Sequence, residues 1–299
     1  MTEILASSAP ASTPARRRPA LSPARAADFK QCPLLYRFRA VDRLPETPSR
    51  VQVRGTVVHA VLEQLFALPA DQRAPEVGRG LIDPVWRDVL AGSPKLAELF
   101  AGPDDPELAE WLDSARALVE AYFALEDPRL IAPEACELLV EAELPTAAGE
   151  ALLLRGYIDR LDVAPTGEIR VVDYKSGAAP REVFEAKALF QMKFYALVLL
   201  RIRGVVPRQL RLMYLADRQA LSYHPDEEEL VRFERTLGAI WSAILRAAQD
   251  GDFRPNPSRM CDWCDHKPRC PAFGGTPPPY PGWPDPAGAG TETARDRAE

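Results

Sequence analysis

Hydrophobic and polar residues alternate in the middle of the chain, and this alternation predicts β-strands. We expect three consecutive antiparallel strands over residues 134–144, 151–163 and 168–175, with turn residues at 164–167 between the last two. Two further strands are predicted over residues 208–216 and 220–224. Together these strands would form the sheet at the centre of the fold.

Apolar residues three and four positions apart predict helices around this sheet. A helix is expected around His59, an amphipathic one over residues 106–125, one over residues 181–203, and a long one over residues 226–250 that starts with acidic residues. Strands mixed with helices in this order predict an α/β domain whose central mixed sheet is flanked by helices.

Two carboxylates and one amine gather on two of the predicted strands. Asp159 lies in Arg-Gly-Tyr-Ile-Asp-Arg, and Asp173 and Lys175 lie in Val-Val-Asp-Tyr-Lys. The hairpin would bring Asp159 and Asp173 together, and Lys175 would share the face of Asp173. Carboxylate oxygens suit Mg²⁺ or Mn²⁺, and such a site can hydrolyse phosphodiesters. The alternative is an ordinary hairpin with a surface salt bridge.

Three of the five cysteines form a second cluster. Cys261, Cys264 and Cys270 have the dense spacing of a metal site, which requires a fourth ligand. The spacing alone allows zinc, with Cys32 or His266 as that ligand, and equally an iron-sulfur cluster. The fifth, Cys136, lies in a strand pattern and is expected to be a small buried hydrophobe.

Three more segments complete a resemblance to a known family. They are Gly55-x-x-x-His59 upstream, Gln191-x-x-x-Tyr195 downstream, and the N-terminal Ser-Pro, aromatic, Cys-Pro pattern that ends at Cys32-Pro. In this order they resemble the PD-(D/E)XK nucleases, specifically the RecB-like branch with an iron-sulfur cluster, which includes AddB and the CRISPR-associated RecB-like nucleases.

The resemblance implies a restriction-endonuclease-like fold and assigns roles to residues. It implies that Mg²⁺ or Mn²⁺ is held by His59, Asp159, Asp173 and the backbone carbonyl of Tyr174, and that Lys175, Gln191 and Tyr195 complete the catalytic set. It also implies that a [4Fe-4S] cluster, with Zn²⁺ as the alternative, is held by Cys32, Cys261, Cys264 and Cys270. Such a cluster would fasten the N-terminal part of the domain to its C-terminal part.

The function implied is that of a metal-dependent DNA nuclease. A stand-alone RecB-like exonuclease on single-stranded or end-bearing DNA, in repair or recombination and with a helicase or recombination partner, fits the resemblance. The chain has no Gly-Lys dipeptide, so it carries no Walker A loop and no helicase motor of its own. The alternatives are a non-catalytic DNA-binding or accessory subunit and a metal-stabilised interaction module.

Net charge argues against nucleic-acid binding, but its distribution does not. The chain carries a net charge of -6, whereas residues 16–54 contain ten basic and three acidic residues, a local charge of +7. This segment, with Arg37, Arg39 and Arg54, is predicted to follow DNA phosphates. The alternative is a solvated helix face with a basic tail.

Composition also predicts the domain limits. Residues 21–272 would form the nuclease domain, with a helical insertion over about 67–130 and the cysteine cluster over 255–272. Residues 1–20 and 273–299, rich in Pro, Ala and Gly, read as disordered tails. No apolar run approaches the length of a membrane span or a signal-peptide core, so a cytoplasmic protein is expected.

Overall fold

The fold is built around one mixed β-sheet. In the computed structural model, which describes residues 19–146, 151–179 and 185–283, this sheet has six strands: β1 (Ala20–Leu21), β2 (Ala135–Leu144), β3 (Leu152–Val163), β4 (Ile169–Lys175), β5 (Gln209–Tyr214) and β6 (Gln219–Tyr223). The pairs β2–β3, β3–β4 and β5–β6 are antiparallel, and β4–β5 is parallel. The predicted central mixed sheet is confirmed, and the ends of the five predicted strands lie within two residues of their expected positions.

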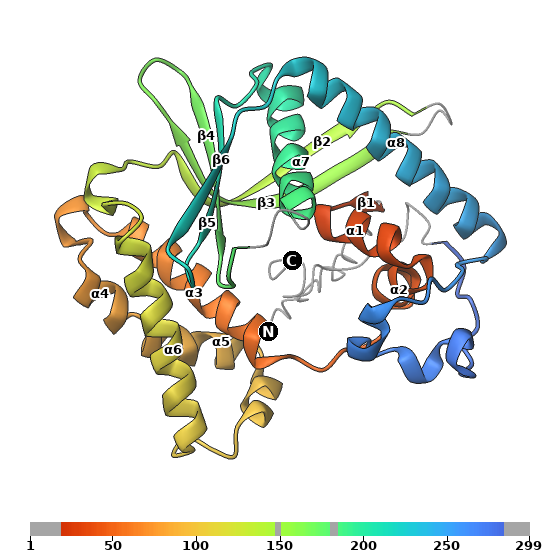
Figure 1. Ribbon diagram of the computed structural model, residues 1–299, viewed down its shortest axis with the longest axis horizontal. Helices are drawn as coiled ribbons and strands as arrows, with labels where there is room; N and C mark the ends of the chain where they lie inside the picture. The colour runs from red at the N-terminus through yellow and green to blue at the C-terminus, as the bar shows by residue number, and fades with distance from the viewer. Residues whose placement is uncertain (1–18, 147–150, 180–184, 284–299) are drawn as a thin grey trace, which may run out of the picture.

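Helices pack against the sheet in two groups, each with its own hydrophobic core (Figure 1). The first core joins the sheet to α1 (Pro23–Gln31), α2 (Pro33–Tyr36), α7 (Glu185–Arg203) and α8 (Glu227–Asp250). The second core joins the ends of β4 and β5 to α3 (Arg50–Ala67), α5 (Ile82–Gly92) and α6 (Pro106–Phe123), with α4 (Pro75–Gly80) beside α6. The predicted α/β class is thus confirmed, and the first residues of the helix expected over 181–203 lie outside the described residues.

A capping box sets the start of the helix that carries His59. Ser49 is the N-cap of α3 and accepts a hydrogen bond from the backbone N–H of Gln52, while the Gln52 side chain accepts one from the backbone N–H of Ser49. This capping box satisfies two of the donors that a helix N-terminus leaves free. It therefore fixes the first turn of α3 and, with it, the position of His59 two turns further on.

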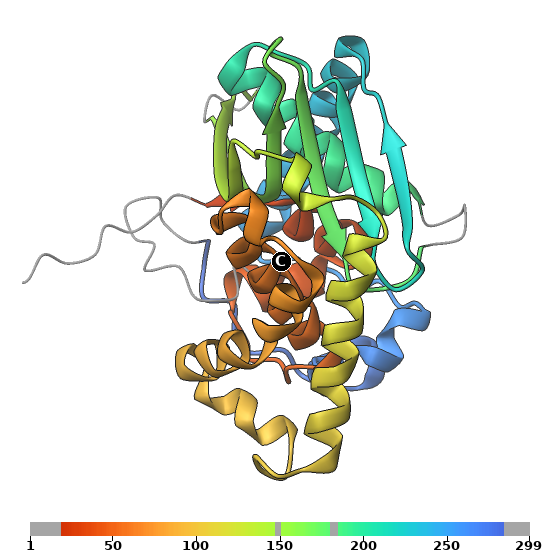
Figure 2. The same cartoon turned by 90° about the vertical axis from the view of Figure 1, so that its left-hand side faces the viewer.

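The predicted helical insertion between α3 and β2 projects from one end of the sheet (Figure 2). Its interior includes an aromatic cluster in which the rings of Trp86 and Trp111 are 4.9 Å apart. At the base of the insertion, the buried guanidinium of Arg73 donates hydrogen bonds to the backbone carbonyls of Phe66, Leu68, Pro128 and Ile131. Because these carbonyls come from both ends of the insertion, Arg73 holds the two ends together.

Two predicted tail boundaries are wrong. Ala20 belongs to β1, which pairs in parallel with Leu153 and Leu154 of β3, so the N-terminal part of the domain begins before residue 21. At the other end, Tyr280 donates a hydrogen bond to the Ala248 carbonyl at 2.8 Å and Trp283 packs on Trp241. Aromatic anchors keep residues up to 283 against α8. The predicted tails at 1–18 and 284–299 lie outside the described residues.

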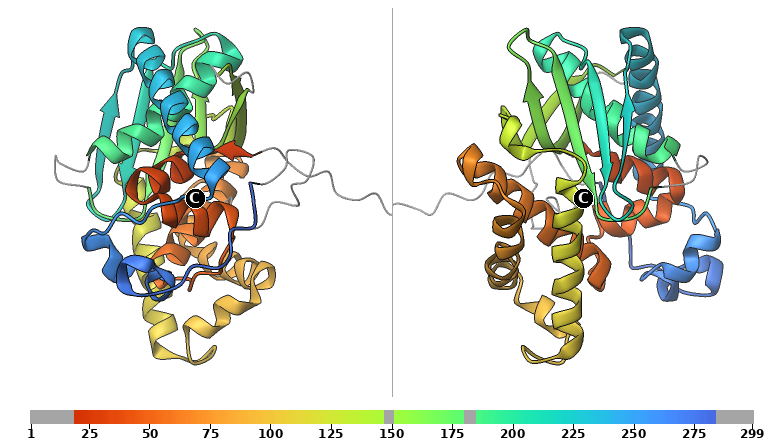
Figure 3. Two further views of the ribbon diagram at one scale, coloured as in Figure 1. Left: turned by 90° about the vertical axis from the view of Figure 1, so that its right-hand side faces the viewer. Right: turned by 60° about the vertical axis from the view of Figure 1, so that its left-hand side comes forward.

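The C-terminal segment that follows α8 lies beside the start of the domain (Figure 3). The Leu34 backbone N–H donates to the Arg254 carbonyl at 3.3 Å, and the Asn256 side chain donates to the Gln31 carbonyl at 2.9 Å. Cys32 and the other three clustered cysteines therefore meet although they are far apart in sequence. Within the described residues, no helix combines the length and apolar character needed to cross a bilayer.

Candidate active site

The candidate site lies where β3 and β4 separate. Their backbone pairing ends at Arg160 and Val172, and the next pair in this register would be Asp159 with Asp173. At that level the backbone N–H of Tyr174 instead donates to Oδ2 of Asp159 at 2.7 Å. The register thus places Asp159 and Asp173 at the same level on adjacent strands. There the carboxylate of Asp159, rather than a backbone carbonyl, accepts the hydrogen bond from β4.

A third carboxylate, that of Glu137, lies at this level on β2. The register of β2 and β3 sets Glu137 opposite Asp159. Glu137 has a φ of 47°, in the left-handed region that non-glycine residues rarely adopt. A strained backbone of this kind is often found at functional sites.

Both strands change face at the level of Glu137 and Asp159. In β2, Leu138 packs in the core with α7, whereas Cys136 packs in the core with α3 and α6. In β3, Ile158 belongs to the α7 core, whereas the Arg160 guanidinium stacks on a ring of α3. The regular alternation of strand faces is interrupted here, so these carboxylates lie between the two cores.

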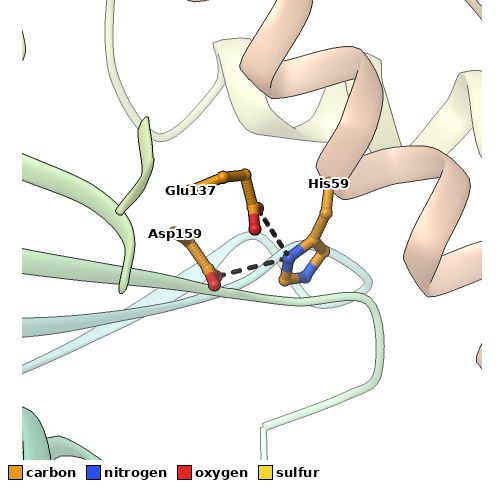
Figure 4. A group of neighbouring side chains, drawn as sticks. All are labelled: His59, Glu137 and Asp159. Atoms are coloured by element: carbon orange, nitrogen blue, oxygen red, sulfur yellow. Dashed lines mark ion pairs between the residues drawn. The ribbon is translucent and has the colours of Figure 1, made fainter. Parts of the chain in front are cut away.

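His59 approaches the carboxylates from α3 (Figure 4). Its Nδ1 is 3.5 Å from Oδ2 of Asp159 and 3.9 Å from Oε1 of Glu137. Its Nε2 lies 2.8 Å from the Tyr174 carbonyl oxygen, which can only accept, so this nitrogen carries a proton. Gly55 allows the approach, because a Cβ there would lie 3.2 Å from the Ser176 hydroxyl.

Lys175 and two residues of α7 form the other side of the site. Lys175 Nζ is 2.7 Å from Oδ2 of the buried Asp173 and donates to Oε1 of Gln191 at 2.8 Å. The Gln191 amide in turn donates to the Tyr195 hydroxyl at 3.3 Å. The structure therefore joins the predicted residues Asp173, Lys175, Gln191 and Tyr195 in one chain of contacts.

A glycine on β3 makes room for α7 at this point. A Cβ on Gly156 would come within 2.8 Å of the Tyr195 ring, which ordinary packing does not allow. Gly156 is three residues before Asp159, so the backbone can approach α7 beside the site. The glycine in Arg-Gly-Tyr-Ile-Asp thus has a packing reason.

Negative charge dominates the electrostatics of the site. Burial raises the pKa of Asp159, and Asp173 and Glu137 add to this effect against the opposing charges of His59 and Lys175, giving a pKa of about 7. Burial alone would lower the pKa of His59, but the carboxylates outweigh it, Asp159 foremost, and raise the pKa to about 9. Burial likewise opposes the charge of Lys175, yet Asp173 and Asp159 raise its pKa, so the ammonium form persists.

This donor set fits a hard divalent cation. One nitrogen of His59 and one oxygen from each of Glu137 and Asp159 all lie within 4.8 Å of one another. Adjacent ligands of an octahedral Mg²⁺ are roughly 3 Å apart when each is about 2.1 Å from the ion. Small side-chain movements would therefore bring these atoms around one ion. Asp173 is one strand away and pairs with Lys175.

Mn²⁺ binding at this site should depend on pH. With a pKa of about 9, His59 is protonated at pH 8, and a metal ligand must be neutral imidazole. Protons therefore compete with the ion, so affinity should rise as pH increases from 7 to about 9 and level off above. Calorimetric Mn²⁺ titrations at pH 8 in two buffers of different ionisation enthalpy should report release of about one proton. Binding heats independent of the buffer would contradict this assignment of His59.

The four clustered cysteines lie around one pocket. Cys32, Cys261, Cys264 and Cys270 all line it. Backbone N–H groups donate to their sulfurs: that of Asn256 to Cys32 at 3.4 Å, that of Ser258 to Cys261 at 3.3 Å, and that of His266 to Cys264. Such donors stabilise thiolates that bind metal.

The alternative zinc ligand, His266, also lines this pocket but forms an ion pair with Glu46. Its buried imidazole places Nε2 2.8 Å from a carboxylate oxygen of Glu46 and packs on the Phe38 ring. Cys136, expected to be a small buried hydrophobe, lies on β2 and is partly buried against the second core.

The three arginines predicted to contact nucleic acid all have partners within the protein. Arg37 is buried and pairs with Asp42, and Arg39 pairs with Asp28 and Glu46. Arg54 donates to the Ser114 hydroxyl of α6. That these side chains follow phosphates stays a prediction, although the three acidic residues of the basic segment are the partners of Arg37 and Arg39.

Sequence analysis does not single out Glu137. Its strand is predicted, but which of its residues faces Asp159 depends on the register of two strands, which the connection over residues 145–151 does not specify. The available signal is a polar residue that interrupts the pattern Ala-Cys-Glu-Leu-Leu before the apolar alternation resumes. That signal alone does not separate a site residue from an exposed one.

Comparison with known proteins agrees with this geometry. The sequence profile of the PD-(D/E)XK nuclease superfamily matches residues 20–271. The chain belongs to this superfamily, and its class is therefore that of a nuclease. The family match covers both the candidate active site and the cysteine cluster.

The relatives are phage and bacterial proteins. The chain is 26% identical to the Gene 69 protein of Mycobacterium phage D29 over 273 residues, covering 82% of this chain and 94% of that protein. It is 24% identical to the Gene 69 protein of Mycobacterium phage L5 over 283 residues, covering 82% and 93%. The crystal structure of a candidate exonuclease from Eubacterium rectale has the same fold, with a TM-score of 0.54, 14% identity and coverage of 83% and 87%.

Proposed function

We propose that this protein is a RecB-like DNA nuclease that depends on Mg²⁺ or Mn²⁺ and acts in DNA repair or recombination. The observation that supports this most directly is the row formed by Glu137, Asp159 and Asp173 across three strands, with His59 and Lys175 at its two ends. Three neighbouring carboxylates, of which Asp173 is buried and Asp159 and Glu137 are partly buried, are costly unless cations neutralise them. A divalent ion would do so in the position where a phosphodiester could be cleaved.

In this proposal, the ion would be held by His59, Asp159 and Glu137. The carboxylate of Asp173 and the carbonyl of Tyr174 would lie next to it. Such an ion polarises a phosphate oxygen and lowers the pKa of a bound water. The ammonium of Lys175 stabilises negative charge that develops on the phosphate. Gln191 holds Lys175 by accepting from Nζ, and Tyr195 holds Gln191 in turn.

We further propose exonuclease action on single-stranded or end-bearing DNA. The solved structure with this fold is described as that of a candidate exonuclease, which favours this mode. A substrate with free ends would be degraded progressively, whereas an endonuclease would also cut a closed circle.

The direct test is cleavage of end-labelled single-stranded, duplex and nicked DNA and of a closed circular plasmid, with Mn²⁺ or with EDTA. We expect Mn²⁺-dependent release of short products from ends, and none from the circle. Asp159→Asn should abolish cleavage, because it removes the carboxylate shared by the ion, His59 and Tyr174. Binding of DNA without cleavage by the wild type would contradict the nuclease proposal and support an accessory role.

The same cleavage assay tests whether Glu137 contributes to metal binding. Glu137→Gln removes a charge from the row but keeps the size of the side chain and its backbone position. Because His59 and Asp159 remain, we expect activity to persist while the Mn²⁺ concentration for half-maximal cleavage rises about tenfold. Glu141→Gln is the matched control, since Glu141 lies on the same strand and pairs with Arg155. Equal behaviour of the two variants would remove Glu137 from the site.

We also propose that Cys32, Cys261, Cys264 and Cys270 hold a [4Fe-4S] cluster. The supporting observations are that all four cysteines line one pocket, that backbone N–H groups donate to three of their sulfurs, and that His266 pairs with Glu46. Four thiolates suit iron-sulfur ligation, and zinc is the alternative for the same set.

A further inference from the structure

Arg160, which directly follows Asp159 on β3, has no exposed surface. A guanidinium stays charged when it is buried, so it needs partners. It pairs with Glu126 and, at 3.0 Å, with Asp162. It also donates to the Tyr174 hydroxyl at 2.9 Å. The charged side chain of Arg160 and these partners therefore lie next to the candidate site.

These contacts join the insertion to the strands of the site. Glu126 follows α6, the last helix of the insertion, and also accepts a hydrogen bond from the Tyr122 hydroxyl at 2.8 Å. The Arg160 guanidinium stacks over the ring of Phe66, on the helix that carries His59, at 4.8 Å from its centroid. One cation therefore contacts α3, β3, β4 and the end of the insertion.

Tyr174 connects this buried network to the metal-binding groups. Its backbone N–H donates to Asp159 at 2.7 Å and its carbonyl accepts from His59 at 2.8 Å. It also lies between Asp173 and Lys175 on β4. Because strand residues alternate, its phenol points to the opposite face, where Arg160 holds the hydroxyl. The position of the phenol thus affects the peptide that orients His59 and Asp159.

We propose that Arg160 and Glu126 are positioning residues for the metal-binding groups, and that the insertion is therefore a required part of the active site. This inference rests on the proposed nuclease function. A shift of Glu126 would move Arg160, then Tyr174, and then the peptide that holds His59 and Asp159. Neither Arg160 nor Glu126 needs to touch the substrate for this role.

Arg73 provides a matched comparison within the chain. It is also a buried arginine, and it stacks on the same Phe66 ring at 5.1 Å from its centroid. Within the described part of the chain, its hydrogen bonds go to backbone carbonyls at the base of the insertion and not to Tyr174, Asp159 or His59. Replacing Arg73 should weaken the insertion without disturbing the Tyr174 hydroxyl.

The test measures Mn²⁺ binding by electron paramagnetic resonance, the Mn²⁺ dependence of cleavage, and thermal unfolding. Glu126→Gln should weaken Mn²⁺ binding and raise the half-saturating concentration about tenfold or more, the usual effect of losing a group that orients metal ligands. The double variant Glu126→Leu with Arg160→Met removes both charges and keeps apolar volume. Its unfolding temperature should return toward that of the wild type while Mn²⁺ binding stays weak, because the Tyr174 hydroxyl has lost its donor.

Arg73→Met should lower the unfolding temperature and leave Mn²⁺ binding unchanged. If Mn²⁺ binding instead follows the unfolding temperature in all three variants, Arg160 and Glu126 are only structural and the inference is wrong. Unchanged Mn²⁺ binding by Glu126→Gln would also contradict it. A wild-type protein that neither binds Mn²⁺ through Asp159 nor cleaves DNA would contradict the proposed function itself, so the two failures are distinguishable.

Discussion

Lys175→Ala is expected to slow DNA cleavage by about 10²- to 10³-fold, the usual effect of removing a group that stabilises transition-state charge. The Lys175 ammonium lies 2.7 Å from Asp173 and 2.8 Å from Gln191, so it is fixed before substrate binds. Because the metal-binding groups remain, Mn²⁺ binding should not weaken. The measurement is single-turnover cleavage at saturating Mn²⁺, together with a circular dichroism spectrum that shows the fold is retained.

Lys193→Ala is the matched control for this prediction. Lys193 also forms a salt bridge at 2.7 Å, to Glu229 of α8, but away from the strand carboxylates. Its replacement should leave the cleavage rate within about twofold of the wild type, because this partly exposed salt bridge contributes little to stability and does not involve the strand carboxylates. Full activity of Lys175→Ala would end the proposed catalytic role of Lys175.

Loss of the metal proposed to be held by the four cysteines should destabilise the whole protein. A metal joining Cys32 to Cys261 closes a very long loop, and a cross-link of that kind contributes on the order of 5 kcal/mol by analogy with a disulfide. Cys264→Ser should therefore lower the unfolding temperature by about 10 °C or more. It should also detach the C-terminal segment from α1 and α2, which limited proteolysis would detect.

Metal content and colour separate the possible outcomes. Anaerobically purified wild type should be brown and contain about four iron atoms per chain. Cys136→Ser should keep the iron, since Cys136 lies on β2 away from the other cysteines, whereas Cys264→Ser should lose it. A colourless wild type with one zinc ion per chain would overturn the iron-sulfur proposal, and an equally stable Cys264→Ser would overturn the structural role.

Local patterns were sufficient to predict the hairpin that carries Asp159, Asp173 and Lys175. The two strands are consecutive and joined by a short turn at Gly167, so their alternation and turn residues largely set their register. The same holds for Gln191 and Tyr195, which are one helical turn apart and do form a hydrogen bond. In both cases the interacting residues are close in sequence.

Expectations drawn from composition alone agree least with the structure. The basic segment suggested arginines free to bind phosphates, but folding pairs Arg37 and Arg39 with acidic residues of the same segment. The predicted C-terminal tail contains aromatic residues, and Tyr280 and Trp283 pack against α8. Composition gives the number of charges and aromatic rings but does not show which of them find partners.

The insertion illustrates the same limit. Its amphipathic helix could be predicted, because Trp111, Leu118 and Tyr122 recur on one face and are buried. The sequence could not predict that Glu126, which follows this helix, would pair with Arg160 next to the site. This pairing depends on how α6 packs on β3 and β4, which no periodicity along the chain specifies.

The sequence by itself determined the order of strands and helices, the β3–β4 hairpin with its two carboxylates and lysine, and the family to which the chain is similar. These features depend on hydrophobic periodicity, turn chemistry and motif spacing, which are local properties of the chain. Only the tertiary structure decided that Glu137 joins the row, that Gly55 and Gly156 let helices approach it, and that Arg160 links it to the insertion. Those contacts depend on strand register and helix packing between distant segments, because side chains far apart in sequence meet only after the chain has folded.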